Sequence, residues 1–383
     1  MKILYIYKDY YPVLGGIENH IRFLAEAMQA RGHEVEVLVT SRDRRTRREV
    51  INGVPVLKTA RWLDLSSAPL SPRLAWEYWR RVLSKNRPAI VHLHAPYPPG
   101  ELAWLAGSFL PGFGRKGPAA VLTYHSDIIK QKRLLTFYAP FLRAVLRRVN
   151  VILPTSPGYI KSSPFLQPLE AKCQPVPLGI ELERFAGVPE VVPAKLAEIR
   201  AKPGPLLLFT GRLRYYKGLQ YLIEAMPAIA PEARLVIVGV GPQEAELKGL
   251  TDRLGLAERV VFAGEVSDAE LPAYYAATDI FVLPACERSE AFGLVQLEAM
   301  AAAKPVVSTE LGTGTSYVNQ HGETGLVVPP ADPAALAGAV NKLLWDAELR
   351  QEMGQRGQLR ARAEFSLTKM VNRLEEIYIR LSS

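Results

Sequence analysis

The second half of the chain contains the stretch LLLFTGRLRYYKG, residues 206–218. It predicts a buried strand over 206–210, a glycine turn at Gly211, a basic loop and a helix that starts at Gly218. Ligands of open α/β sheets bind beyond the carboxyl ends of parallel strands. Arg212 and Lys217 follow this strand, and a planar guanidinium beside a compact ammonium suits a diphosphate. An ordinary solvated basic loop is the alternative interpretation.

Short apolar segments typical of buried strands recur along the whole chain. In the first half they cover residues 2–7, 34–40, 54–57, 90–93, 121–124 and 151–154. In the second half they cover residues 206–210, 235–238, 260–262, 280–283, 305–309 and 325–328. Helical patterns occur at 18–31, 218–230, 242–254, 268–276, 292–302, 333–345, 347–365 and 367–381. This alternation predicts α/β structure, with parallel sheets covered by helices on both faces.

An extended connection starts at residues 173–178, and the proline-containing segment 187–205 is the predicted linker between the two series of strands. We predict an N-terminal Rossmann-like domain of residues 1–186, joined by the closing helix 366–383. The C-terminal Rossmann-like domain covers residues 187–365. Two doubly wound domains in tandem predict a ligand cleft between the carboxyl ends of both sheets.

The composition is that of a soluble globular chain. Its 383 residues are 48% hydrophobic and 22% charged, which excludes disorder, collagen-like repeats and coiled coil. No apolar run reaches the roughly 18 residues of a membrane span, and the apolar N-terminus is too short for a signal peptide. Cys173 and Cys286 lie far apart and fit neither a disulfide framework nor a metal motif. We therefore expect a cytoplasmic protein without a metal site.

Positive charge is concentrated in the first half of the chain. Residues 1–190 contain 27 Lys and Arg against 15 Asp and Glu, a net charge of +12, whereas residues 191–383 have a net charge of −3. The first half should favour anionic partners such as phosphate ligands, nucleic acid or an acidic membrane face. The basic residues that form the two densest groups are Arg42, Arg44, Arg45, Arg47 and Arg48, and Lys130, Lys132, Arg133, Arg143, Arg147 and Arg148. Ordinary solubility would also explain such arginines.

A second motif, EAFGLVQLE, covers residues 290–298. A strand ends shortly before it, and a helix is expected to start near Phe292. Backbone N–H groups in the first turn of that helix are free to bind an anion; they belong to Gly293, Leu294 and Val295. Glu298 lies about two turns after Glu290 among apolar residues, where a carboxylate needs a reason such as hydrogen bonds to ligand hydroxyls. The alternative has Glu290 as a charge on the helix dipole and Glu298 on the surface.

Three weaker signals also follow predicted strands. Gly15 and Gly16 let backbone N–H groups approach a phosphate in front of a helix, although they do not form the dinucleotide fingerprint. Gly241 follows the strand 235–238 and offers a close backbone platform for a flat base. His125 follows the strand 121–124, where it can meet a substrate, although a lone histidine is more often structural. Asp127 could orient His125 or meet an acceptor hydroxyl.

Together and in this order, these motifs resemble the retaining glycosyltransferases of family 4, also called group 1, which have the GT-B fold. The resemblance covers nearly the whole chain, and its most specific parts are GRL at 211–213 with Lys217-Gly218, and the two glutamates of residues 290–298. The segment that contains His125 is similar to bacterial members that build cell-surface polysaccharides on lipid carriers.

The resemblance implies a role for each matching position in the C-terminal domain, which binds a nucleotide-activated sugar in that family. Arg212 and Lys217 would neutralise the diphosphate leaving group. Glu290 would hold the hydroxyls of the donor sugar, and Glu298 would accept hydrogen bonds from the ribose. The same donor site would include the backbone at Gly211, Gly241, Phe292, Gly293, Leu294 and Val295.

The N-terminal domain binds the acceptor in this family. The resemblance implies that Gly15 and Gly16 contact the donor phosphate and that His125 faces the donor sugar near its anomeric carbon. His125 and Asp127 are the candidates on the acceptor side. The acceptor is expected to be a lipid-linked saccharide at an anionic membrane, which places the protein in the cytoplasm or peripherally on the inner face of the cytoplasmic membrane.

The expected reaction is the metal-independent transfer of a hexose with retention at the sugar carbon. The sequence contains no D-x-D pair, and cations with helix N-termini can stabilise a departing diphosphate. The resemblance favours front-face attack over a carboxylate nucleophile, and GDP-mannose as the donor, with UDP-sugars left open. A sugar-nucleotide epimerase on the same fold is the alternative, and a basic nucleic-acid-binding protein is a remote one.

Overall fold

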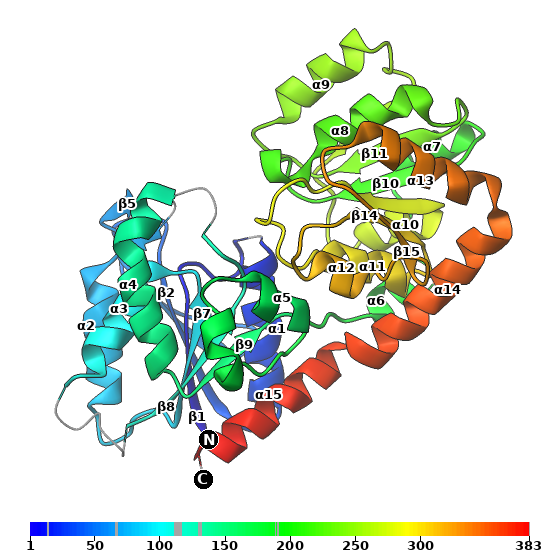
Figure 1. Ribbon diagram of the computed structural model, residues 1–383. Helices are drawn as coiled ribbons and strands as arrows, with labels where there is room; N and C mark the ends of the chain where they lie inside the picture. Colours follow the sequence, from blue (N-terminus) through cyan, green and yellow to red (C-terminus); the bar gives the residue numbers. More distant parts are fainter. Residues whose placement is uncertain are drawn as a thin grey trace. The chain divides into compact units, whose positions relative to one another are not determined.

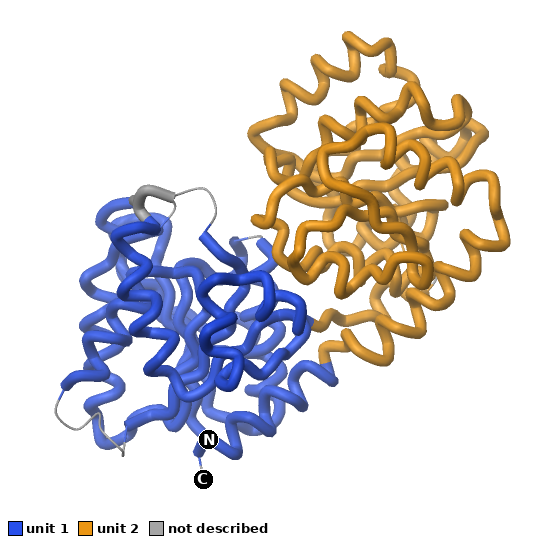
Figure 2. The backbone as a smooth tube through the Cα atoms, viewed as in Figure 1, with its two compact units in different colours: residues 1–178, 368–383 blue, residues 179–367 orange. Residues whose placement is uncertain are grey.

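The computed structural model describes residues 1–13, 15–65, 68–110, 117–128, 132–187, 189 and 191–382. The chain forms two compact units, which are coloured separately in Figure 2. Unit 1 comprises Met1–Leu178 and Thr368–Ser383, and unit 2 comprises Gly179–Leu367. The chain therefore passes from one unit to the other twice.

Unit 1 is built on a seven-stranded sheet in the order β3-β4-β2-β1-β7-β8-β9. Its strands are β1 (Lys2–Ile6), β2 (Glu34–Thr40), β3 (Arg47–Ile51), β4 (Val54–Thr59), β7 (Ile90–Ala95), β8 (Ala119–Tyr124) and β9 (Val151–Pro154). All neighbours are parallel except β3 and β4. A separate two-stranded hairpin joins β5 (Leu63–Leu65) to β6 (Ala68–Leu70). The central strands β1 and β7 are almost wholly buried, as expected for a sheet covered on both faces.

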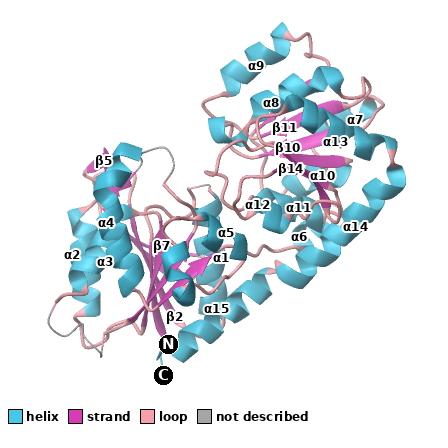
Figure 3. Cartoon of the chain, in the orientation of Figure 1, coloured by secondary structure: helices cyan, strands magenta, loops and turns pink. Residues whose placement is uncertain are grey.

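Helices cover both faces of this sheet (Figures 1 and 3). They are α1 (Gly16–Ala30), α2 (Pro72–Val82), α3 (Pro98–Gly107), α4 (Lys132–Arg148), α5 (Pro157–Ser162), the 3₁₀ helix η1 (Gln167–Lys172) and α15 (Leu367–Ser382). The last of these packs its apolar stripe on unit 1, and Tyr378 meets Tyr5 of β1 and His92 of β7 there. The final helix of the chain thus completes the first unit.

Unit 2 is built on a six-stranded, wholly parallel sheet in the order β12-β11-β10-β13-β14-β15. Its strands are β10 (Leu206–Thr210), β11 (Arg234–Val238), β12 (Val260–Gly264), β13 (Ile280–Leu283), β14 (Val306–Thr309) and β15 (Gly325–Val328). Its α-helices are α6 (Glu183–Ala186), α7 (Ala194–Ala201), α8 (Leu219–Ala225), α9 (Glu244–Arg253), α10 (Leu271–Ala277), α11 (Leu294–Ala301), α12 (Thr315–Val318), α13 (Pro333–Trp345) and α14 (Ala347–Glu364). Two 3₁₀ helices, η2 (Tyr215–Lys217) and η3 (Met226–Ala228), complete it.

The predicted strands and helices are present, with their ends shifted by a few residues. The helix expected over 218–230 is α8 followed by η3, because Pro227 cannot continue α-helical hydrogen bonding. The helix expected from Phe292 begins at Leu294, since Gly293 before it takes a left-handed conformation with φ of +74°. The short helix α6 packs on α10 and α11, so it belongs to unit 2, whereas the predicted boundary after 186 put it in the first domain.

Strand β3 was not predicted; it places Arg47 and Arg48 on an antiparallel edge strand. Asn52 and Gly53 connect β3 to β4 with φ of +49° and +82°. Positive φ at both central residues is the geometry of the tight hairpin turn that Asn-Gly favours. This dipeptide was the available signal, and the polar pattern of β3, which is mostly exposed, concealed the strand.

None of the helices among the described residues combines the length and the hydrophobicity that a membrane span requires. The densest basic group of unit 1 is exposed: it comprises Arg42, Arg44, Arg45, Arg47 and Arg48. Lys130 of the second basic group, and the side chains of Lys132 and Arg133, lie outside what the structure describes. Arg143, Arg147 and Arg148 of that group are exposed on α4.

Candidate active site

The sheet of unit 2 has its topological switch point at β10. Chain order runs from β10 to β11 and β12 on one side, and then returns to β13, β14 and β15 on the other. Loops that leave the two sides diverge here, so the carboxyl end of β10 is the expected position of a ligand. The loop after β10 carries Arg212 and Lys217, and the loop after β13 carries Glu290.

Glycines allow the backbones of neighbouring loops to come unusually close at this edge. The Gly211 N–H donates to the Val238 carbonyl oxygen at 3.0 Å. A Cβ atom at Gly239 would lie 2.1 Å from the Gly211 oxygen, and one at Gly241 would lie 2.4 Å from the Leu213 oxygen. Gly211 and Gly239 also have φ of +137° and +122°, which other residues adopt with strain. The predicted platform at Gly241 is thus a place of close backbone approach.

Lys217 and Glu290 form an ion pair at the centre of the site. The Lys217 Nζ lies 2.5 Å from Glu290 Oε2, and the two side chains are only 11% and 10% exposed. Burial lowers the pKa of Lys217, but the negative charge of Glu290 and the neighbouring Tyr216 and Glu298 outweigh it, so the pKa is raised. Lys217 therefore keeps its positive charge although it is buried.

Two contacts hold the loops that carry this ion pair together. A Cβ atom at Gly218, whose φ is +68°, would lie 2.0 Å from the Pro284 oxygen after β13. The Cys286 N–H donates to the Tyr216 carbonyl oxygen at 2.9 Å. The Thr313 hydroxyl donates to the Glu290 carbonyl oxygen at 2.8 Å, which ties the second loop to the chain after β14. These contacts hold the backbones of the two loops that carry the pair.

Arg212 differs from Lys217 in its surroundings. Its side chain is exposed and makes no hydrogen bond or ion pair with any residue that the structure describes. Its guanidinium is therefore free to meet an anionic ligand in this part of the molecule. The wholly buried strand β10 ends two residues before Arg212, so the arginine follows a firmly packed element.

Helix α11 directs its N-terminus to the same edge of the sheet. Gly293 is its N-cap and provides no side chain. The N–H groups of Gly293, Leu294 and Val295 make no hydrogen bond within the described residues, as expected for the first turn of a helix. Phe292, next to them, is buried. The predicted helix start with free N–H groups is therefore present, and its binding of an anion stays a prediction.

Glu298 lies one turn further along α11 and takes part in a hydrogen-bond chain. The Tyr275 hydroxyl donates to Glu298 Oε2 at 2.6 Å and lies 2.5 Å from the Thr210 hydroxyl at the end of β10. Burial raises the pKa of Glu298 to about 7. The sequence did not single out Tyr275, because a tyrosine in a helical pattern looks like an ordinary core residue.

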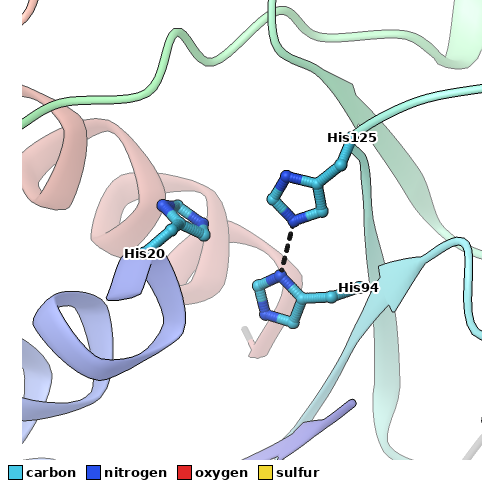
Figure 4. Close-up of side chains that lie close together, drawn as sticks. All are labelled: His20, His94 and His125. Carbon is cyan, nitrogen blue, oxygen red and sulfur yellow. Dashed lines mark hydrogen bonds between the residues drawn. The ribbon is translucent and has the colours of Figure 1, made fainter. Parts of the chain in front are cut away.

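His125 lies in unit 1, directly after β8. It is 3% exposed, its N–H donates to the Ala95 oxygen at 2.9 Å, and its Nε2 lies 3.0 Å from His94 Nδ1. Figure 4 shows this contact together with His20. Burial lowers the pKa of His125 well below its usual value, so the ring is neutral.

Asp127 forms hydrogen bonds with other residues of unit 1. Its Oδ1 accepts hydrogen bonds from the Tyr124 hydroxyl at 2.8 Å and the Ser163 hydroxyl at 2.7 Å, and its N–H donates to the Tyr159 hydroxyl at 2.8 Å. These contacts fix the loop after β8 that carries His125. They do not show the expected role of Asp127 toward an acceptor, which stays a prediction.

Gly15 and Gly16 lie at the start of α1 in unit 1. Gly15 is the N-cap, and a Cβ atom there would lie 2.1 Å from Glu18 Oε2. The Glu18 side chain thus folds back over the helix N-terminus at the position expected to contact a phosphate. Gly15, Gly16, His125 and Asp127 all belong to unit 1: the two glycines lie at the start of α1, and His125 and Asp127 follow β8.

A further hollow in unit 1 was not predicted. Its volume is about 220 Å³, and it lies beyond the carboxyl ends of β1 and β2. The lining residues are Asp9, Tyr10, Pro12, Val13, Thr40, Ser41, Arg42, Arg47 and Lys58. Its charged lining includes Asp9, which pairs with Arg61, and Arg47 and Lys58, which pair with Asp43 and Glu49. Arg42 has no such partner among the described residues, so the apolar lining and this arginine suit a ligand with both an apolar and an anionic part.

The two largely parallel sheets, one in each unit, define a chain with two Rossmann-like α/β domains. Two family profiles match: residues 14–184 match the family described as Glycosyltransferase Family 4, and residues 195–360 match Glycosyl transferases group 1. The chain belongs to this family, the group 1 glycosyltransferases, and the resemblance found in the motifs is confirmed.

The relatives support the same assignment. The chain is 36% identical over 96% of its length to a D-rhamnosyltransferase, WbpZ, of Pseudomonas aeruginosa, of which 92% is covered. It is 34% identical over its whole length to an O-antigen chain mannosyltransferase C of Escherichia coli, of which 99% is covered. The predicted similarity to bacterial cell-surface polysaccharide glycosyltransferases is therefore confirmed.

A solved structure shows the same fold. The crystal structure of Anabaena HepE in complex with UDP superposes with a TM-score of 0.80 at 19% identity, covering 98% of this chain and 99% of the other. The predicted GT-B class, with two Rossmann-like domains, is confirmed.

Proposed function

We propose that the protein is a retaining hexosyltransferase that moves mannose from GDP-mannose to a hydroxyl of a lipid-linked saccharide during cell-surface polysaccharide synthesis. The observation that carries this proposal is the buried Lys217–Glu290 pair at the switch point of unit 2. Mannose is chosen because one relative over the whole chain is a mannosyltransferase of O-antigen chains.

In this proposal the diphosphate is stabilised by cations and backbone N–H groups. Lys217 and the free Arg212 neutralise the charge that develops as the bond to the sugar breaks, and the first turn of α11 adds hydrogen bonds. This set of donors needs no Mg²⁺ or Mn²⁺. Glu298 accepts from the ribose hydroxyls, and Glu290 accepts from the sugar hydroxyls with the oxygen that does not meet Lys217.

The step proposed at the sugar is front-face attack. The bond between the anomeric carbon and the diphosphate oxygen breaks, the acceptor oxygen bonds to that carbon from the same side, and the acceptor proton passes to the diphosphate. A carboxylate nucleophile is the alternative route to retention. Glu290 is ill suited to that role because its charge is already engaged by Lys217. His125, with a neutral ring, is proposed to face the anomeric carbon.

An anionic membrane surface is the proposed location of the acceptor. The exposed arginines of the segment 42–48 lie beside the hollow of unit 1 described above, which includes Arg42 and Arg47. A lipid diphosphate with its attached saccharide has the combination of apolar and anionic groups that this hollow suits. The protein would then act peripherally on the inner face of the cytoplasmic membrane.

A donor panel tests the proposal. The purified protein is incubated with GDP-, UDP- and ADP-sugars, with and without a lipid-linked saccharide, and both released nucleotide and glycosylated product are measured. Transfer from GDP-mannose that requires the acceptor is expected. Conversion of the donor sugar without acceptor would support the epimerase alternative, and transfer only from a UDP-sugar would overturn the donor assignment.

Alanine variants test the site itself. Loss of one preorganised electrostatic contact lowers the rate by about 10²–10³-fold. Arg212→Ala and Lys217→Ala should each show such a loss, while Arg253→Ala, a change at an exposed arginine on α9 of the same unit, should not. Near-normal turnover of both site variants would overturn the assignment of the diphosphate to this edge.

A further inference from the structure

Three buried histidines meet in unit 1, although they come from distant parts of the sequence (Figure 4). His20 lies on α1, His94 on β7, and His125 directly after β8. One ring nitrogen from each lies within 4.8 Å of the other two. Their exposed fractions are 4%, 1% and 3%. Two strands of the central sheet and a packed helix therefore fix this cluster.

The hydrogen-bonding capacity of the cluster is largely unused. Both ring nitrogens of His20 and Nε2 of His94 have no partner among the described residues, and the one bond present joins His94 Nδ1 to His125 Nε2 at 3.0 Å. Buried polar atoms are normally paired, so an unpaired group needs an explanation. A cation bound by the His20 ring is one such explanation for that residue.

His92, two residues before His94 on the same strand, shows the contrast. Its Nδ1 lies 2.5 Å from the Tyr378 hydroxyl and its Nε2 lies 2.7 Å from the Thr123 hydroxyl. This fold therefore provides partners for both nitrogens of a buried structural histidine. The unpaired nitrogens of His20 and His94 do not follow that pattern.

The three rings are also in the chemical state that binds a metal. Burial of all three rings disfavours a charged imidazolium. Only the neutral imidazole has a lone pair to offer a cation. Imidazole suits Zn²⁺, Cu²⁺ and Ni²⁺, whereas Mg²⁺ and Mn²⁺ prefer oxygen ligands.

We propose that His20, His94 and His125 form a binding site for a single Zn²⁺ ion or a chemically similar divalent cation. Zinc–nitrogen bonds of about 2.0–2.1 Å in a tetrahedron place the nitrogens about 3.3 Å apart. The nitrogens of His94 and His125 already lie near this separation. The His20 nitrogen lies within 4.8 Å of them, so rotation of its ring must move it by at most about 1.5 Å. The proton shared by His94 and His125 moves to the other nitrogen of its ring. The fourth position stays open to water or a ligand.

Metal at this site would inhibit transfer, a consequence that rests on the proposed function. Coordination withdraws His125 from the donor sugar, so Zn²⁺ should lower turnover and a chelator should restore it. If Zn²⁺ binds to these histidines and turnover is unchanged, the proposed role of His125 is wrong, while the metal site stands.

The binding test uses the full chain without an affinity tag. Zn²⁺ is titrated by calorimetry, Co²⁺ by visible absorption, and Mg²⁺ as the comparison. We expect one equivalent of Zn²⁺ or Co²⁺ and no binding of Mg²⁺. His20→Leu should lower the Zn²⁺ affinity at least tenfold, since removal even of a supporting group outside the ligands lowers metal affinity 10–100-fold. Because the His20 ring has no hydrogen bond to lose among the described residues, this variant should melt no earlier than the wild type without metal.

Two further variants make the result decisive. His125→Asn should also lower the affinity at least tenfold, whereas His321→Gln, which changes an exposed histidine of unit 2, should leave it unchanged. Zn²⁺ should raise the melting temperature of the wild type and of His321→Gln only. Absence of saturable Zn²⁺ binding, equal affinity in His20→Leu and the wild type, or loss of binding in His321→Gln would each overturn the proposal.

Discussion

Glu298 combines two properties that are rarely found in a surface glutamate. It is a carboxylate among apolar neighbours on α11, and it accepts a hydrogen bond from Tyr275. Its raised pKa means that protonation competes with any ligand that needs the ionised form. The ionisation state of Glu298 should therefore change the affinity of the site for such a ligand.

We predict that affinity for the nucleotide sugar depends on pH through Glu298. Ribose hydroxyls bind the carboxylate, so protonation below its pKa of about 7 weakens binding. Affinity should fall about tenfold from pH 8 to pH 6. Calorimetry with the nucleotide sugar measures this, because its diphosphate does not titrate in this range. Glu298→Gln should remove the pH dependence; an unchanged slope in that variant would assign it to another group.

Replacing each of the two glutamates of the site by glutamine should have different effects on turnover and on nucleotide affinity. Glu290→Gln weakens the bonds to the sugar, so turnover should fall about 10²–10³-fold while affinity for the free nucleoside diphosphate, which has no sugar, changes little. Glu298→Gln should instead lower that affinity roughly 10–100-fold, because ribose belongs to both ligands. Calorimetry and a product assay on both variants are sufficient. Equal losses of nucleotide affinity would show that the two roles are wrongly assigned.

At the scale of elements, apolar runs and glycines were enough to predict most strands of both sheets. A buried parallel strand such as β10 is apolar on both faces, so its sequence shows it directly. The edge strand β3 is polar and mostly exposed, so its sequence did not indicate a strand. The Lys217–Glu290 pair joins residues 73 positions apart, and only the order of the strands brings them together.

The histidine cluster was missed for the same reason. Motif searches look for metal ligands at short spacing, whereas His20, His94 and His125 lie on three elements that only the sheet of unit 1 brings together. Tyr275 likewise gains its role from a contact with Glu298 on another helix. Sequence can thus indicate which loops carry chemistry, but not which side chains from other elements complete it.

The close approach of the loops after β10 and β11 can be tested at Gly239. Gly239→Ala would place a methyl group against the Gly211 oxygen and displace the loop that carries Arg212. The variant should lose most of its nucleotide affinity and melt earlier than the wild type. Gly264→Ala is the matched control, because Gly264 also has a positive φ but no atom within 4 Å of the added methyl group. Both variants share the backbone strain of a positive φ at alanine, about 1–2 kcal/mol. Equal nucleotide affinity in the two variants would refute the role of close approach.

At the scale of the whole molecule, we predict that EDTA does not abolish transfer. The proposed diphosphate contacts are cations and backbone N–H groups, so no Mg²⁺ is needed to neutralise the leaving group. Turnover should stay the same, or rise if Zn²⁺ was bound. Activity lost with EDTA and restored by Mg²⁺ or Mn²⁺ would contradict the metal-independent mechanism.

Unit 1 should bind anionic membranes through its arginines. Each basic residue near such a surface contributes about 1 kcal/mol, so replacing Arg42, Arg44 and Arg45 by alanine should weaken binding about 100-fold. Flotation with phosphatidylserine vesicles at low and high salt measures this. The control replaces the exposed arginines 253, 356 and 362 of unit 2. Equal recovery of wild-type protein with neutral and anionic vesicles would count against the prediction.

The position of α15 affects how the chain is made. During synthesis the strands of unit 1 leave the ribosome first, but their covering helix follows only after all of unit 2. Until then the apolar surface of unit 1 on which α15 packs remains exposed to water. The residues of α15 that later cover it are Met370, Val371, Leu374, Ile377 and Tyr378. Such transient apolar surface is where nascent chains associate wrongly or recruit chaperones. A truncation or fusion near the carboxyl end therefore acts on the maturation of the amino-terminal unit.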